Sequence, residues 1–273
     1  MRLSFSLFAF TLIMFTSCQK EDEEEANQIS AQALEDNAEF ESTFNGIESV
    51  SVDVADKESD NANYEYKSCA SISVVPNWLS GQWPKTITVD FGDTNCLGRD
   101  GNYRRGKIRV EITGRYRDSG TVITTSLENF YHNNNRVQGS KTKTNLGRNS
   151  NNNLNYEVKV ENAHIEHVNG YSFGWNSNRN VEWIDGENTL FNFFDDQYLV
   201  TGSANGFTGE GKNYSLNITK SLEVQLNCRW IKSGTIAIKP ENFDERTVDY
   251  GNGNCDRLAT YTVNGKEYQL SMR

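Results

Sequence analysis

The stretch that decides the fold is Thr88-Val-Asp-Phe-Gly-Asp-Thr-Asn-Cys96, which returns later in the chain as Thr247-Val-Asp-Tyr-Gly-Asn-Gly-Asn-Cys255. A further cysteine precedes each of these two cysteines by 27 residues, at Cys69 and at Cys228. The two copies match without a gap over nearly forty positions, which is hard to obtain by chance. We infer that one β unit was duplicated and that its repeated residues serve the same local structure in both copies.

Alternating apolar and polar residues run through both units and through the chain between them. They are clearest over residues 86–91, 107–112, 156–161 and 267–272. This alternation is typical of half-buried antiparallel strands, and the Asn-Gly and Asp-Gly pairs between the runs favour tight hairpins. We therefore predict an all-β domain over residues 66–273, an antiparallel meander that forms a sandwich or an open barrel. Its duplicated units lie near 69–112 and 228–272.

The cysteines predict two disulfides. Cys18 belongs to a predicted export signal, which is described in the next paragraph. The other four cysteines are an even number, as expected for disulfides in an exported chain. Equal spacing favours the pairs Cys69–Cys96 and Cys228–Cys255, because a duplicated unit should carry its own bridge. Cross-pairing between the two units is the main alternative. A zinc site is disfavoured, since the chain has neither Cys-x-x-Cys nor a nearby histidine pair.

The first 17 residues have the features of a signal peptide. Arg2 is followed by an apolar run from Leu3 to Phe15, which is too short to span a bilayer, and then by the small residues before Cys18. This ending resembles a bacterial lipobox, which predicts that Cys18 is lipidated and anchors the chain to a membrane. The alternative is an ordinary secretory leader with a chance cysteine.

The charge of the chain is concentrated near its start. Residues 19–68 hold 15 acidic residues against 3 basic ones, whereas residues 69–273 hold 22 against 23. We predict an acidic stalk over residues 18–65 with a possible short helix at 28–45. Such a helix could dock weakly on the domain, which we favour, or merely extend the stalk. The run Gln19 to Glu25 resembles the acidic export signal of Bacteroidota lipoproteins, which implies the outer membrane and the cell surface; a plain solvated spacer is the alternative. The acidic leader says nothing about what the domain binds, and we expect no nucleic-acid partner.

Two groups of residues are candidates for binding. Oxygen-bearing side chains around two glycines, at Asp249, Asn252, Asn254 and Asp256, are candidate calcium ligands, although the EF-hand spacing is absent and a simple turn is the alternative. Arg105, Lys107 and Arg109 share one face of a predicted strand and form a candidate patch for anionic polysaccharide or lipid phosphates. Here the alternative is an ordinary solvated strand face.

No catalytic signature is visible. The chain has no Gly-x-Ser-x-Gly motif, and its most visible carboxylate pair is Asp195-Asp196, whose side chains diverge if they lie on a strand. Apart from the candidate calcium ion, no cofactor is expected.

Four longer motifs resemble a family of Bacteroidota surface lipoproteins with no assigned activity. They are Cys69 to Val74, Lys85 to Gly92, Cys228 to Ile236 and Thr247 to Asp256. The resemblance implies a surface lipoprotein and transfers no activity. We expect a non-enzymatic binding or envelope-structural module at the outer membrane, with a polysaccharide or a partner protein as ligand. The alternative is a polysaccharide-active enzyme.

Overall fold

The computed structural model describes residues 16–56, 69–98, 100–189, 195–228 and 230–271. It contains one long helix, one short 3-10 helix and fourteen strands, all within these ranges. The elements are α1 (Thr16–Asp56), β1 (Ser71–Val75), η2 (Trp78–Ser80), β2 (Lys85–Asp90), β3 (Cys96–Leu97), β4 (Tyr103–Ile112), β5 (Val122–His132), β6 (Asn135–Arg148), β7 (Leu154–Glu166), β8 (Ser172–Asp185), β9 (Gln197–Phe207), β10 (Asn213–Gln225), β11 (Ser233–Pro240), β12 (Arg246–Asn252), β13 (Leu258–Val263) and β14 (Lys266–Ser271).

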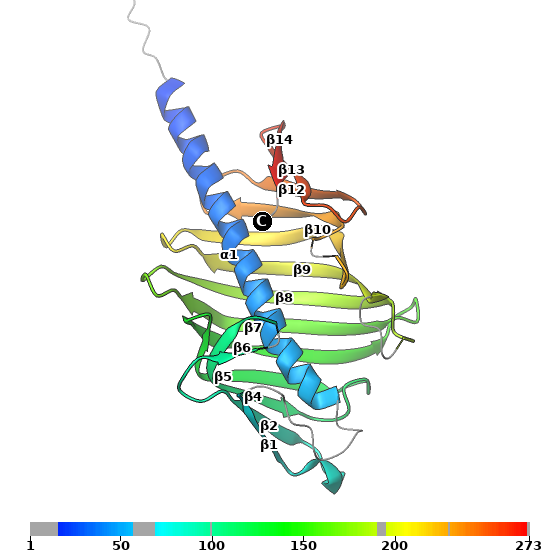
Figure 1. Ribbon diagram of the computed structural model, residues 1–273. Helices are drawn as coiled ribbons and strands as arrows, with labels where there is room; N and C mark the ends of the chain where they lie inside the picture. Colours follow the sequence, from blue (N-terminus) through cyan, green and yellow to red (C-terminus); the bar gives the residue numbers. More distant parts are fainter. Residues whose placement is uncertain (1–15, 57–68, 99, 190–194, 229, 272–273) are drawn as a thin grey trace, which may run out of the picture.

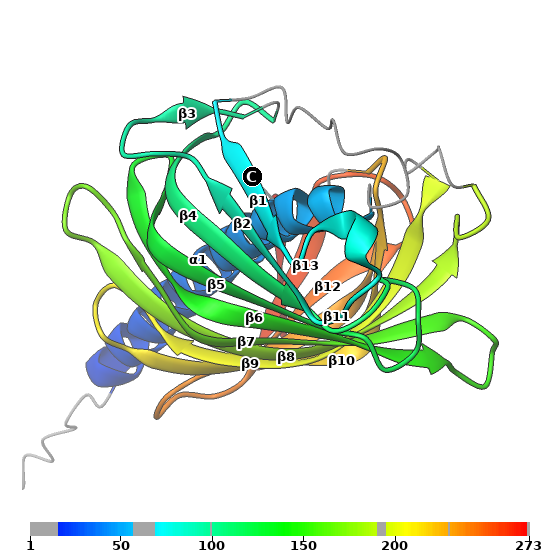
Figure 2. The ribbon, with the colours of Figure 1, turned by 90° about the horizontal axis from the view of Figure 1, so that it is seen from below.

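The strands form one open antiparallel sheet (Figure 1). Each strand from β4 to β14 lies beside its predecessor in sequence, β1 and β2 continue the order at one edge, and the short β3 pairs with β4. The predicted all-β antiparallel meander is confirmed, and its strands form one open sheet. The sheet curves around α1 (Figure 2).

The alternation predicted from sequence places apolar side chains on the concave face. Val89 on β2 lies opposite Ile108 on β4, and both are fully buried. Tight turns fall at the predicted places. The β5–β6 turn uses Asn133 and Asn134, both at positive φ, and the β13–β14 turn uses Asn264 and Gly265 in the same way. Each turn fixes the pairing of the strands that it joins.

The two predicted disulfides are present. Cys69 pairs with Cys96 at a Cα–Cα distance of 5.6 Å, and Cys228 pairs with Cys255 at 5.7 Å. Cys69 lies just before β1, and Cys228 lies shortly before β11. Every pair of neighbouring strands in the sheet is antiparallel, and the order of the strands makes β1 and β11 run in opposite directions. The two disulfides therefore brace opposite ends of the sheet.

Helix α1 differs most from the sequence-based expectation. It covers Thr16–Asp56 in place of 28–45, and Gly46 does not interrupt it. A glycine costs about 1 kcal/mol inside a helix. Burial of Phe40, Phe44 and Ile47, each at most 2% exposed, offsets that cost, because burying one large apolar side chain contributes about 1.5–3 kcal/mol. Phe40 stacks on Trp175 of β8 with ring centroids 5.2 Å apart.

The acidic side chains of α1 pair with basic side chains of the sheet. Glu48 binds Lys141 and Lys143 of β6, and its Oε1 lies 2.7 Å from the Nζ of Lys143. Glu41 binds Arg179 of β8 at 3.1 Å. Glu25 pairs with Lys212 at 2.8 Å, and Glu39 shares a hydrogen bond with the Nε2 of His167 at 3.0 Å. An acidic segment that would repel itself as a free stalk is therefore docked along its length by opposite charges.

The docked helix decides where a binding site can lie. Side chains of α1 from Ala26 to Ser51 are buried against the concave face, so this face is already occupied by the chain itself. What remains accessible is the convex face of the sheet and the connections at its two ends.

Candidate functional site

A pocket of about 380 Å³ lies beside the first disulfide, at the end of the sheet where β2 stops. Its size falls within the range of small-molecule sites. The wall consists of the Cys69–Cys96 bridge together with polar groups from the connection between β2 and β3, and the lining includes Ser71, Asp90, Gly92, Thr94 and Asn95. The first copy of the repeated motif thus forms most of this pocket.

The backbone of the pocket is shaped by two glycines. Asp90 accepts a hydrogen bond from the N–H of Gly92 at 2.9 Å, and Gly92 takes a positive φ of 74°. The N–H of Gly106 donates to the carbonyl of Gly92 at 2.8 Å. Gly106 lies at a bulge in β4 with φ 86°, where a Cβ would come within 2.1 Å of the carbonyl oxygen of Asn129. Only glycine fits there, and the bulge shifts the register of β4 against β5 between Arg105 and Lys107.

Arg105 does not line this pocket but contacts it through the lining residue Asn95. Its Nη1 donates to the side-chain oxygens of Asn95 and Asn134, both at 3.0 Å. Its guanidinium lies over the ring of Tyr131, 3.7 Å from the centroid, which is a close cation–π contact. Asn95 also donates to Asn134 at 2.9 Å, so these three polar side chains form a closed set. Because Asn95 lines the pocket, the guanidinium is fixed at the pocket's edge.

The other two predicted cations are neutralised by neighbours. Lys107 pairs with Asp90 at 2.9 Å, and Arg109 pairs with Glu111 at 2.9 Å. The hydrogen bond from Lys107 holds the pKa of Asp90 below its usual value, and Asp90 in turn raises the pKa of Lys107. The predicted patch is therefore reduced to Arg105, whose hydrogen-bond partners within the described residues are neutral amides.

The second copy of the motif keeps the turn but lacks this site. Asp249 accepts from the N–H of Gly251 at 2.8 Å, as Asp90 does from Gly92. The position equivalent to Arg105 is Asn264, which lies in the β13–β14 turn. The motif itself therefore serves backbone shape in both copies, and the cation is particular to the first.

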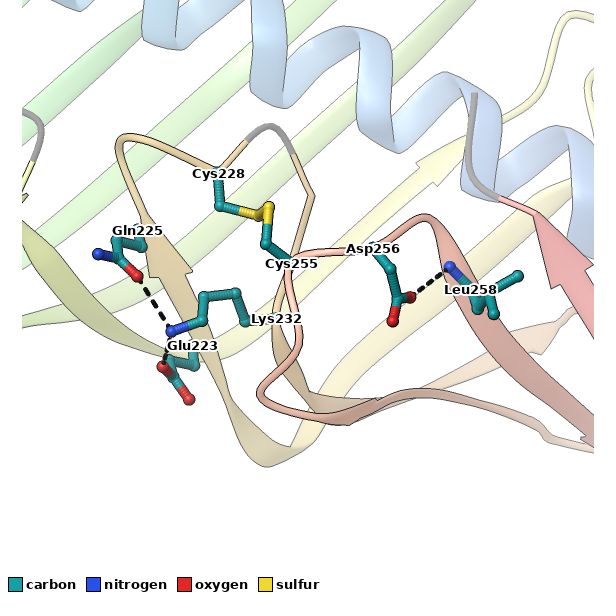
Figure 3. The surroundings of a disulfide bond; sticks show 7 residues. All are labelled: Glu223, Gln225, Cys228, Lys232, Cys255, Asp256 and Leu258. Atoms are coloured by element: carbon teal, nitrogen blue, oxygen red, sulfur yellow. Dashed lines mark hydrogen bonds and ion pairs between the residues drawn. A yellow bond between two sulfur atoms is a disulfide. The ribbon is translucent and has the colours of Figure 1, made fainter.

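The predicted calcium ligands surround the second disulfide. Asp249 and Asn252 lie on β12, whereas Asn254 and Asp256 lie in the connection to β13. Asp256 accepts from the N–H of Leu258 at 2.8 Å (Figure 3). Both carboxylates thus bind backbone N–H groups of their own turns. Calcium binding here stays a prediction.

Figure 3 also shows a polar cluster on the other side of the Cys228–Cys255 bridge. Lys232 donates to Glu223 at 2.7 Å and to Gln225 at 3.0 Å. This cluster links β10 to the segment just before β11, and the charge of Lys232 is paired with that of Glu223. Across the described part of the chain, no three histidine, cysteine or acidic side chains gather as a metal site would require.

The carboxylate pair Asp195-Asp196 does not act as a unit. Asp195 accepts from the hydroxyl of Thr189 at 2.9 Å, whereas Asp196 accepts from the hydroxyl of Tyr198 at 3.0 Å. Asp196 is only 4% exposed, and burial raises its pKa. The pair precedes β9 and does not lie on a strand, and its two carboxylates have different hydrogen-bond partners.

Cys18 lies within α1, seven residues before the ion pair between Glu25 and Lys212. In the region that the structure describes, no helix has both the length and the apolar character needed to cross a membrane.

Sequence reasoning missed the basic residues that receive α1. Lys141 and Arg179 are both 5% exposed. The neighbours of Lys141 on its face of β6 are the polar Lys143 and Asn145, whereas Arg179 lies on the face of β8 that buries Trp175 and Trp183. The placement of Arg179 is a usable signal, since a charged side chain on the apolar face of an alternating strand requires a buried partner. The signal does not say where the partner comes from, and here it comes from α1.

The chain matches no protein-family model, and no similar protein is found among curated proteins or solved structures.

Proposed function

We propose that this chain is an outer-membrane lipoprotein, anchored through Cys18 and facing outward, which acts as a non-enzymatic binding module. A polysaccharide is the ligand that the exposed chemistry fits best. The observation that carries the proposal is the continuity of α1, which runs from beside the lipidation motif into the concave face of the sheet.

This continuity changes the expected role of the acidic leader. Seven residues of helix separate Cys18 from the first ion pair with the sheet, a span of roughly 10 Å at about 1.5 Å per residue. Acyl chains on Cys18 would then be joined to the sheet by a docked helix in place of a free tether. Such a connection keeps the β domain close to the membrane and in one orientation.

Two further observations support binding over catalysis. The aspartates of the repeated motif, Asp90 and Asp249, are each occupied with their own turns. The concave face, where a curved sheet would enclose a substrate, is filled by α1. The surfaces left to a ligand are open, and open surfaces suit the capture of a long chain such as a polysaccharide.

The anchor is tested by comparing the native chain with Cys18→Ser, and Ser17→Ala, which keeps a small residue before Cys18, serves as the matched control. We expect the native chain and the control to sediment with membranes and to be cut by protease added to intact cells. Cys18→Ser should appear in the soluble fraction. Sedimentation of Cys18→Ser with membranes, or full protection of the native chain on intact cells, would rule out the surface anchor.

The rival enzymatic role is tested on the same protein with polysaccharides. Binding without release of shorter products supports the module. Release of products that stops in Asp196→Asn would instead support a polysaccharide-active enzyme, because Asp196 is a buried carboxyl with a raised pKa.

A further inference from the structure

Arg105 keeps one edge of its guanidinium free. An arginine side chain has five N–H groups, and the two on Nη1 are used by Asn95 and Asn134. The Nε and Nη2 groups form the other edge, and within the described residues no side chain or carbonyl accepts a hydrogen bond from them. That edge is the one that binds a carboxylate through two parallel hydrogen bonds.

The free edge is also held in place before any ligand arrives. Tyr131 supports the flat side of the guanidinium at 3.7 Å, and the two amides fix its rotation. Asn134 sits at a positive φ of 69° in the β5–β6 turn, so its side chain is positioned by the turn itself. A cation that is ordered in advance loses less entropy on binding than a free lysine does.

The charge around the pocket discriminates between anions. Asp90 is paired with Lys107, and Asp93 lies near enough to Lys107 to raise its pKa. Lys107 offsets only one of the carboxylates that act on it, which are Asp90, Asp93 and Glu128. The surplus negative charge repels a doubly charged phosphate more strongly than a singly charged carboxylate. The adjoining pocket, with Ser71, Thr94 and Asn95 in its wall, offers hydroxyl and amide groups to the rest of the ligand.

We infer that the pocket beside the Cys69–Cys96 disulfide binds an acidic sugar of a polysaccharide. The sugar carboxylate lies on the Nε–Nη2 edge of Arg105, and the sugar ring lies in the pocket. The inference rests on the proposed binding role and names the ligand class for it. The second disulfide has no equivalent site, since Asn264 replaces the arginine.

The test measures binding of an oligogalacturonate to the detergent-purified full chain by calorimetry, beside the methyl ester of the same oligosaccharide. We expect the acid to bind and the ester to bind at least 10-fold more weakly. Arg105→Gln should weaken binding of the acid by about 10–100-fold, which corresponds to one charge-assisted bidentate pair. Arg105→Lys should fall near the glutamine variant, because an ammonium cannot reproduce the planar edge.

Arg109→Gln is the matched control, since it removes a cation from the same strand that is already paired with Glu111. It should change binding by less than about twofold. Melting temperatures of all variants show whether each has folded. Equal binding of acid and ester, or equal binding by Arg105→Gln and the native chain, would overturn the site.

Competition with inorganic phosphate tests whether the site prefers a carboxylate or a phosphate. At matched ionic strength it should compete no better than chloride, and strong competition would overturn the assignment to a carboxylate. If the native chain binds polysaccharide but Arg105→Gln binds equally well, the binding role stands and this site fails. Release of shorter products would instead contradict the proposed function itself.

Discussion

Replacing Glu48 by Gln should destabilise the whole protein, because Glu48 is the charge that allows two lysines to lie inside the fold. The side chains of Lys141 and Lys143 are 6% and 14% exposed, and both pair with this one carboxylate of α1. Glutamine keeps the size and one acceptor oxygen of Glu48 but removes its charge. The substitution therefore tests the docking of α1 with little change in packing.

The magnitude follows from the partners that remain. Removing one member of a buried ion pair costs about 3–5 kcal/mol, because the other charge stays buried and unpaired. Lys143 keeps a hydrogen bond to the hydroxyl of Tyr116 at 2.7 Å and lies 4.5 Å from the ring centroid of Tyr156. These contacts compensate in part, so we expect about 3 kcal/mol, or a melting temperature lower by roughly 6–12 °C for a domain of this size.

The loss should depend on pH. Burial alone would raise the pKa of Glu48, but the ammonium groups of Lys141 and Lys143 outweigh it and hold that pKa well below its usual value. An acid with a depressed pKa contributes stability that is present above its unfolded pKa, near 4.5, and is lost as the pH falls through the folded pKa. The gap between Glu48→Gln and the native protein should therefore be full at pH 7 and shrink below about pH 4.5.

Thermal and urea unfolding followed by circular dichroism measure this gap. Glu111→Gln is the control, since its partner Arg109 is 46% exposed and the exposed pair should contribute less than about 1 kcal/mol. Adding Lys141→Met to Glu48→Gln should restore part of the lost stability, because it removes one of the unpaired charges. The reasoning is refuted if Glu48→Gln lies within 1 kcal/mol of the native protein, or if the second substitution restores nothing.

Two other substitutions test the pocket and the helix. Gly106→Ala should destabilise by more than about 2 kcal/mol, because its Cβ would collide with the carbonyl of Asn129; Gly120→Ala, which has a similar φ but open space around it, should cost only about 1 kcal/mol. Urea unfolding that finds equal losses would contradict the clash. Burial raises the pKa of Asp36 from 3.8 to about 6, so the contribution of Asp36 to native stability should rise as the pH falls from about 7 to 4. Asp36→Asn should be more stable than the native protein at pH 8, by about 1–2 kcal/mol after solvent screening, and melting curves that show no such pH-dependent gap would argue against a buried carboxylate.

For the acidic leader, the sequence predicted the negative charge and the presence of a helix, but not the length of that helix. The leader's excess of negative charge is plain from the sequence, and a helix within it was predicted. The bounds were wrong because helix length here depends on the surface beneath it. Phe44 and Ile47 on both sides of Gly46 are buried by the sheet, and this burial carries the helix through a residue that would end a free one.

The candidate site, too, was predicted from the sequence only in part. The repeat predicted that its shared residues serve the same local structure, and in the structure Asp90 and Asp249 each accept a hydrogen bond from a glycine of their own turn. That Arg105 differs from Lys107 and Arg109 was not visible, because the three share one strand face. The difference arises from Tyr131 and Asn134 on the next hairpin, which lies beside Arg105 only once β4 and β5 have paired.

The amino-acid sequence by itself determined the strand pattern and the hairpin turns, and it favoured the disulfide pairs that the structure has. These features depend on alternation, on residues that accept positive φ and on equal spacing, all of which act over short distances along the chain. The tertiary structure alone decided that α1 fills the concave face and that Arg105 keeps a free edge. Glu48 meets Lys143 across 95 residues, and Arg105 meets Asn134 across 29. Contacts of that range depend on the strand register and on the curvature of the sheet, and no local pattern records either.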